Sequence, residues 1–281
     1  MIEIKNVQKY LHRLTPQPTS LKPDGAIGNQ IKCVLFDIYG TLFISGSGDI
    51  SLADKKFPQS GQINQLLTRY GINKTAKVLL DDFYQAIKAR HAQLRDRGVE
   101  FPEVRIDQIW TTILPGVDIK MVKQFALEFE LIVNPVYPMP NLQKMLSTFQ
   151  RQGILMGLIS NAQFYTPYLF RWFLSKNFEE LGIDPELVFY SYRFEVAKPS
   201  PKLFRLAAEK LGVRGILSTE VLYVGNDMLN DIYPAKTIGF QTALFAGDRR
   251  SLRLRAEDPR CTNLSADVVV TNLIQLTRHV Q

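Results

Sequence analysis

The stretch Cys33–Leu42 constrains the fold more than any other part of the chain, because it places a carboxylate at the end of a buried strand. Its apolar run Val34–Phe36 is too short for a stable helix and is rich in strand-forming residues. Asp37 follows directly, and Gly40 and Thr41 let the chain turn away. Ligands in open α/β sheets bind beyond the carboxyl ends of the strands, so this position suits a nucleophile, a metal ligand or both. Taken alone, an aspartate there is more often the cap of a turn.

Strands and helices alternate in two parts of the chain, and a long helical segment separates these parts. The pattern predicts strands at 32–36, 155–159, 221–224, 241–245 and 267–270, and helices at 141–150, 167–177, 201–211 and 232–238. Such alternation is typical of a doubly wound parallel sheet with helices on both faces. Residues 52–137 show only three- and four-residue apolar spacing, which predicts an all-helical insertion without a strand.

The predicted domains follow from this pattern. Residues 1–31 form a leader with a short helix at 7–14, residues 32–51 and 138–281 form the α/β core, and 52–137 form the insertion. The stretch 43–48, rich in glycine and serine, is expected to be a loop that leads out of the core.

Three further polar motifs lie after predicted strands or ahead of a predicted helix. Gly157–Asn161 ends a strand with Ser160, Ala197–Pro201 contains Lys198, and Val224–Asp231 carries an acidic signature. Each of these residues has an ordinary structural explanation when taken singly, such as a turn cap or a surface lysine. Their occurrence together at matching strand ends favours one shared site.

With Phe36–Leu42, these motifs resemble the haloacid dehalogenase-like hydrolase superfamily, in the order that the family has them. The resemblance covers most of the chain. It implies a Rossmann-like α/β core and identifies the helical insertion as a cap between the first and second motifs. It also implies an enzyme whose aspartate forms a covalent intermediate, which divides one difficult displacement into two easier ones.

The resemblance implies a role for each motif. Asp37 would be the nucleophile, Ser160 would donate to phosphoryl oxygens, and Lys198 would neutralise developing charge. The implied substrate-binding residues are Thr41, Asn161 and Tyr39. The implied Mg²⁺ ligands are Asp37, the main-chain carbonyl of Tyr39, and a side chain among Asn226, Asp227 and Asp231.

Two departures from the family pattern leave three functions open. Phosphatases of the superfamily usually carry a second Asp where this chain has Tyr39, whereas the haloacid dehalogenases carry Tyr there. A phenol with a pKa near ~10 is a poor proton donor to a leaving oxygen at neutral pH. The fourth motif has Asn226 in place of the usual first Asp, but its five-residue spacing to Asp231 is that of the metal-binding branch. The leading prediction is a Mg²⁺-dependent phosphatase of a small phosphorylated metabolite. The alternatives are a metal-independent 2-haloacid dehalogenase and a catalytically weakened binding or regulatory module.

The composition of the chain limits the classes of partner and the cellular location that we expect. The chain has a net charge of +7 and a pI near 9.3, which is compatible with steering of small anionic substrates. Its densest basic stretch, Arg249–Arg255, has no interleaved aromatics, so we do not expect nucleic acid as a partner and expect a solvated surface there. No uncharged apolar run of ~18 residues is present to span a membrane, no secretion signal is recognisable, and only two cysteines occur. We therefore expect a cytoplasmic protein.

A polar stripe runs along one predicted helix of the insertion. Tyr84, Lys88, His91 and Arg95 follow one another at four-, three- and four-residue steps, so they share a helix face. Such a stripe either faces the active site and binds an anion or is the solvated side of the helix. The second reading is the more common one, and we expect it here.

Overall fold

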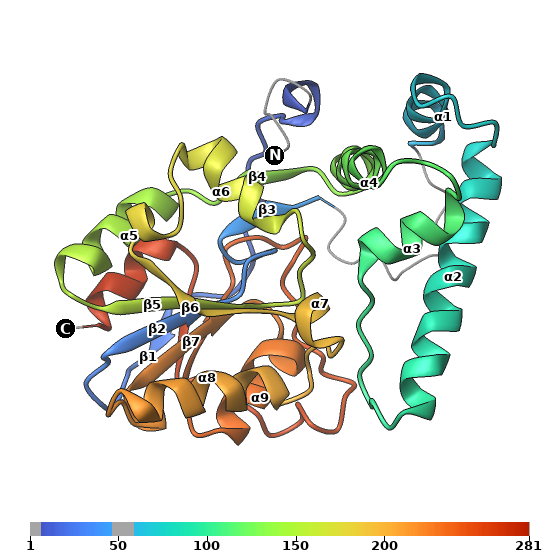
Figure 1. Cartoon of the computed structure of the whole chain (residues 1–281). Coiled ribbons are helices and arrows are strands. Elements are labelled where there is room, and N and C mark those ends of the chain that lie inside the picture. Colours follow the sequence, from blue (N-terminus) through green and yellow to red (C-terminus); the bar gives the residue numbers. More distant parts are fainter. Residues whose placement is uncertain (1–6, 47–58, 281) are drawn as a thin grey trace.

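The computed structural model describes residues 7–46 and 59–280, and its centre is a seven-stranded sheet (Figure 1). The strand order is β1-β9-β8-β7-β2-β5-β6, and every pairing is parallel except that of β1 with β9. The bounds are β1 Asp24–Gly25, β2 Cys33–Phe36, β5 Leu155–Ser160, β6 Ile183–Tyr190, β7 Val221–Gly225, β8 Gln241–Phe245 and β9 Val268–Val270. The doubly wound α/β core is thereby confirmed, with β2 in its interior.

Helices cover both faces of this sheet. Along β2, Val34 and Phe36 belong to one apolar cluster, while Cys33 and Leu35 belong to another, as the two-residue period of a strand requires. The first cluster takes in α5 (Leu142–Arg151), α6 (Thr166–Leu174) and the 3₁₀ helix Leu273–Arg278, and the second takes in α8 (Lys202–Val213) and α9 (Tyr233–Thr237). The carboxyl end of β2 is therefore held between two packed layers.

The helical insertion lies beside the carboxyl edge of the sheet (Figure 1). Its helices are α1 Ser60–Arg69, α2 Ala76–Asp96, α3 Ile106–Ile113 and α4 Ile119–Val133, and residues 59–135 contain no strand. They pack around the fully buried Trp110, whose ring centroid lies 4.6 Å from that of Phe83 and 4.8 Å from that of Phe129. The prediction of an all-helical cap is confirmed. None of the described helices is long and apolar enough to cross a membrane.

Three local predictions are wrong. The stretch expected as a loop contains β3 (Phe43–Ser45), which pairs with β4 (Val136–Pro138), so a strand crosses the predicted end of the insertion at 137. Both strands have three residues, too few for a pattern to detect. The rest of that loop, and the predicted start of the cap at 52, lie outside the described residues. Strand β6 was not predicted, because Asp184, Pro185 and Glu186 interrupt its apolar pattern. These residues are tolerated because β6 is an edge strand of the sheet.

The leader is also more integrated than its sequence suggests. The predicted helix at 7–14 is only the 3₁₀ turn Gln8–Tyr10, and β1 continues the sheet as an antiparallel edge strand. The Tyr10 hydroxyl donates to Glu128 Oε2 on α4 at 2.9 Å, and the Thr19 hydroxyl donates to the Ala246 carbonyl at 2.8 Å. These contacts depend on residues more than 100 positions away, which local sequence cannot reveal.

Helix α4 buries two glutamates whose surroundings differ. Glu128 accepts hydrogen bonds from Tyr10 and Tyr70 and forms an ion pair with Arg69 at 2.6 Å, and these contacts outweigh burial and lower its pKa. Glu130 has no cationic partner among the described residues and accepts from neutral groups on Asn134 and Tyr165. Burial therefore raises the pKa of Glu130 to about 7.

These opposite shifts predict opposite pH effects on stability. The folded state binds the Glu130 proton more tightly than the unfolded chain, so its contribution is present below pH ~4.5 and is lost as pH rises towards 7. We compare the free energy of unfolding of Glu130→Gln with that of the native protein at each pH. From pH 5 to pH 8 this difference should shift in favour of Glu130→Gln by about 2 to 3 kcal/mol. Urea denaturation at the two pH values measures this gain. Glu128→Gln is the matched control and should lose stability at pH 8, while parallel pH curves for the native protein and Glu130→Gln would contradict the assignment.

Candidate active site

Asp37, the predicted nucleophile, lies at the centre of the carboxyl edge of the sheet. The Asp37 amide donates to the Val224 carbonyl at 2.9 Å, which continues the ladder between β2 and β7 by one residue. The side chain of Asp37 is almost buried, with 5% of the residue exposed. Since β5 and β7 flank β2, the residues that follow them, Asn161 and Asn226, lie on either side of Asp37. The structure thus brings the four sequence motifs together.

Lys198 joins the motifs through a buried ion triad with Asp37 and Asp231. Its Nζ donates to Asp37 Oδ1 at 2.7 Å, to Asp231 Oδ1 at 2.5 Å and to the Tyr223 hydroxyl at 3.1 Å. Burial disfavours the ammonium, but Asp231 and Asp37 more than offset this and raise the pKa of Lys198. Lys198 therefore stays charged and fixes Asp37 in one orientation.

Asp231 links the triad to the backbone of the turn after β7. Its Oδ2 accepts the amides of Asn226 and Asp227, both at 2.9 Å, so it also fixes the turn after β7. Gly225 permits this approach, because a Cβ there would lie 2.3 Å from the Asp231 carboxyl carbon. Burial raises the pKa of Asp231, an effect that Lys198 opposes. Both oxygens of this carboxylate are thus occupied by protein donors.

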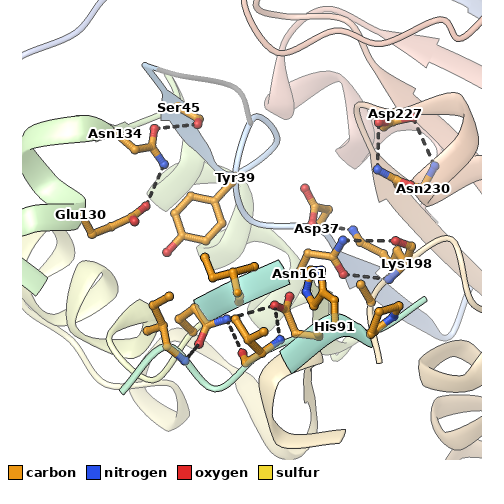
Figure 2. Close-up of a pocket in the computed structure, with 18 of the residues that line it drawn as sticks. Asp37, Tyr39, Ser45, His91, Glu130, Asn134, Asn161, Lys198, Asp227 and Asn230 are labelled. Atoms are coloured by element: carbon orange, nitrogen blue, oxygen red, sulfur yellow. Dashed lines mark hydrogen bonds and ion pairs between the residues drawn. The ribbon is translucent and has the colours of Figure 1, made fainter. Parts of the chain in front are cut away.

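Asp227 is directed towards the following turn. It caps the π-helix Met228–Ile232 by accepting the amides of Leu229 and Asn230, and it forms an ion pair with Arg255 at 2.6 Å. Figure 2 shows Asp227 and Asn230 side by side, apart from Asp37. Because these hydrogen-bond donors occupy the Asp227 carboxylate, it is less suited to bind a metal ion than the family resemblance implies.

Asn226 is held by Thr41 and by the loop after β8. The Thr41 hydroxyl donates to Asn226 Oδ1 at 2.9 Å, and Asn226 Nδ2 donates to the Ser251 carbonyl at 2.6 Å. Gly40, with φ of +87°, makes room, since a Cβ there would lie 2.8 Å from Asn226 Nδ2. Thr41 is fully buried and does not line the cavity, so its observed contact is with Asn226.

Ser160 and Asn161 occupy different positions although they are adjacent. Ser160 is fully buried, and its hydroxyl has no hydrogen-bond partner among the described residues. Asn161 lines the cavity and holds the backbone of Lys198, accepting its amide at 2.8 Å and donating to its carbonyl at 3.3 Å. Asn161 therefore positions Lys198, a contact that sequence alone does not reveal.

Tyr39 lines the cavity but is not equipped for proton transfer. Its hydroxyl shares a 2.9 Å hydrogen bond with Thr166, and burial raises its pKa. At neutral pH the phenol keeps its proton, as expected from the sequence.

The donors for a metal are few. Among the described residues, no three acidic, histidine or cysteine side chains converge in a way that holds a metal ion. Of the side chains that the family pattern implies as Mg²⁺ ligands, two keep an oxygen available for a metal. These are Asp37, through its second carboxylate oxygen, and Asn226, through the second lone pair of its amide oxygen. This set fits Mg²⁺, which binds few protein oxygens and keeps several waters, and it does not fit a metal that needs a closed protein cage.

A cavity of about 690 Å³ opens above Asp37, between core and cap. The core contributes Asp37, Tyr39, Asn161, Lys198 and Asn226 to its lining, and the cap contributes Tyr84, Lys88, His91, Arg95 and Glu130. The expectation that the stripe on α2 faces solvent alone is therefore wrong. Arg253 and Arg255 also line the cavity, so part of the basic stretch Arg249–Arg255 belongs to the site.

Curated relatives include enzymes of phosphate chemistry. The glyceraldehyde 3-phosphate phosphatase of Methanocaldococcus jannaschii is 25% identical over 215 residues, which are 75% of this chain and 83% of the relative. The enzyme of the same name from Pyrococcus furiosus is 30% identical over 141 residues, 49% of this chain and 52% of the relative.

Solved structures agree on the fold and differ in their chemistry. A 2-haloacid dehalogenase from Pseudomonas syringae has a TM-score of 0.56 at 18% identity, over 89% of this chain and 98% of that one. A HAD phosphatase from Thermococcus onnurineus has a TM-score of 0.54 at 20% identity, over 88% and 97%. At such identities the likeness shows the fold alone.

The family model for haloacid dehalogenase-like hydrolases matches residues 31–239, which include all four motifs and the cap. The chain therefore belongs to the haloacid dehalogenase-like hydrolase family.

Proposed function

We propose that the chain is a Mg²⁺-dependent phosphatase of small phosphorylated metabolites that acts through an aspartyl-phosphate on Asp37. The observation that carries this proposal is the ion triad, which holds Asp37 at the floor of a cavity bordered by cationic side chains. The names of the curated relatives support phosphate as the group transferred.

The proposed first step is an in-line displacement at phosphorus. One Asp37 oxygen forms a bond to phosphorus while the bond from phosphorus to the ester oxygen breaks, and its electron pair leaves with that oxygen. Lys198 keeps the attacking carboxylate oriented, and its charge offsets part of the repulsion between carboxylate and phosphate. Water then hydrolyses the aspartyl-phosphate, which releases inorganic phosphate and regenerates Asp37.

Ser160 and Asn161 are proposed to act at the phosphoryl group, as the family pattern implies. The Ser160 hydroxyl has no hydrogen-bond partner among the described residues, so it is available as a donor at the end of β5. Mg²⁺, when bound by Asp37, the Tyr39 carbonyl and Asn226, would neutralise phosphate charge. Asp227 and Asp231 would add negative charge near it without direct coordination, since protein donors occupy both carboxylates.

Replacing the nucleophile tests the proposal directly. Asp37→Asn is expected to lower the hydrolysis of p-nitrophenyl phosphate by roughly 10³-fold or more, because the amide cannot form the acyl phosphate. Chelation with EDTA should abolish native turnover, and added Mg²⁺ should restore it. Asp96→Asn, an exposed carboxylate at the end of α2, is the matched control and should keep native activity.

The same assay separates the alternative functions. Tyr39 favours the alternative of a 2-haloacid dehalogenase. If the protein releases halide from 2-chloropropionate and EDTA does not affect this release, the dehalogenase function replaces the proposed phosphatase function. If Asp37→Asn hydrolyses p-nitrophenyl phosphate as fast as the native protein, Asp37 is not the nucleophile.

Tyr39 predicts how the rate depends on the leaving group. Because its phenol does not transfer a proton, the leaving oxygen departs without a positioned acid, which typically costs on the order of 10²- to 10⁴-fold. In a series of aryl phosphates, kcat/KM should therefore fall steeply as the pKa of the released phenol rises. Tyr39→Phe should show the same slope, whereas a steeper slope in this variant would identify Tyr39 as the acid.

A further inference from the structure

Four polar side chains on α2 form one wall of the active-site cavity. Tyr84, Lys88, His91 and Arg95 all line the cavity that Asp37 lines, and at 1.5 Å per residue they extend over about 16 Å. Figure 2 shows His91 directed to the region of Asp37, Asn161 and Lys198. The wall thus passes the region of Asp37 at His91, and it extends along the cavity on both sides of that residue.

Two cations of this wall have no counter-ion among the residues that the structure describes. Neither Lys88 nor Arg95 forms an ion pair or side-chain hydrogen bond with the described residues, and both side chains are exposed. By contrast, Arg90 on the same helix pairs with Glu195 at 2.6 Å. An exposed cation is ordinary on a convex surface, but two on the wall of a cavity raise the local concentration of anions there.

The carboxylates that share the cavity are already partnered. Asp37 and Asp231 bind Lys198, and Asp227 binds Arg255. Glu103 accepts from Ser191 at 2.8 Å, and Glu130 accepts from Asn134 at 3.1 Å. None of these carboxylates forms an ion pair with Lys88 or Arg95.

His91 lies between the two cations and differs from them. It is half-buried, and both burial and Arg95 lower its pKa, so it is neutral near pH 7. A neutral imidazole still supplies one hydrogen-bond donor. The wall therefore offers two charges and one neutral donor.

We propose that Lys88 and Arg95, with His91 between them, bind a second anionic group of the substrate, a phosphate or a carboxylate. The substrate class is then a phosphate monoester that carries a second anion at the far end of a short chain. This inference rests on the proposed function, since Asp37 has to receive the first phosphate. A guanidinium and an ammonium in one wall suit such a group, because charge-assisted hydrogen bonds to anions are the strong ones.

Matched ligand pairs test the inference without requiring turnover. The probes are 1,n-alkanediol bisphosphates with two to five carbons, the ω-hydroxyalkyl phosphates that lack the second phosphate, and the corresponding ω-phosphoalkanoates. Titration calorimetry with Asp37→Asn compares their affinities. We expect at least one chain length at which the doubly anionic ligand binds roughly 10-fold or more tightly than its hydroxyl counterpart.

Variants assign that preference to the wall. In the Asp37→Asn background, Lys88→Gln and Arg95→Gln should each reduce the preference roughly 10-fold or remove it, and Lys88→Arg should retain most of it. Lys77→Gln, which removes an exposed cation of α2 outside the cavity, should leave the preference as it is. Equal reductions by Lys77→Gln would show a general field effect and overturn the subsite.

The outcomes also separate this inference from the proposed function. Equal affinity within every matched pair overturns the second-anion subsite even when p-nitrophenyl phosphate is hydrolysed. A preference that depends on Lys88 and Arg95, found in a protein that hydrolyses no phosphate ester, sustains the subsite and refutes the hydrolysis. The bisphosphate and phosphoalkanoate arms show whether the second anion is phosphate or carboxylate.

Discussion

The contact of Lys198 with Asp37 and Asp231 is the interaction on which the site depends. Removing two carboxylates and an ammonium from water is costly unless each is paired, so the loss of one member leaves an uncompensated buried charge. The three residues come from different motifs and fold together only when β2, β6 and β7 are in register. The triad keeps one net negative charge, so under the proposed function a phosphate dianion at Asp37 needs a further cation beside it, the role proposed for Mg²⁺.

Core and cap thus divide the chemistry between them. The core fixes Asp37, the proposed nucleophile, through contacts among Asn161, Lys198 and Asp231. On α2, Lys88 and Arg95 make no ion pair or side-chain hydrogen bond with the described residues, and both line the cavity. The short pair β3 and β4 carries the chain between the two parts.

The residues that meet at the sheet edge were predictable because parallel strands bring their carboxyl ends together. The position of Asp37 follows from four apolar residues and a turn. Other features were beyond the sequence for physical reasons. A polar stripe has the same pattern whether it meets bulk water or a water-filled cavity, so the direction of Lys88 depends on how the cap packs. The partners of Asp227 and the shifted pKa of Glu130 likewise depend on contacts between distant segments.

Tyr39 and the cationic wall have a common rationale under the proposed function. Without an acid at position 39, the loss of the leaving oxygen has a higher barrier, and only interactions that strengthen in the transition state lower it. A remote anion held by Lys88 and Arg95 can supply binding energy that fixes the phosphate in line with Asp37. Such an enzyme would be slow with simple alkyl phosphates, which cannot reach the wall, and faster with substrates that carry the second anion. Selectivity would then arise because the missing acid makes turnover depend on remote binding.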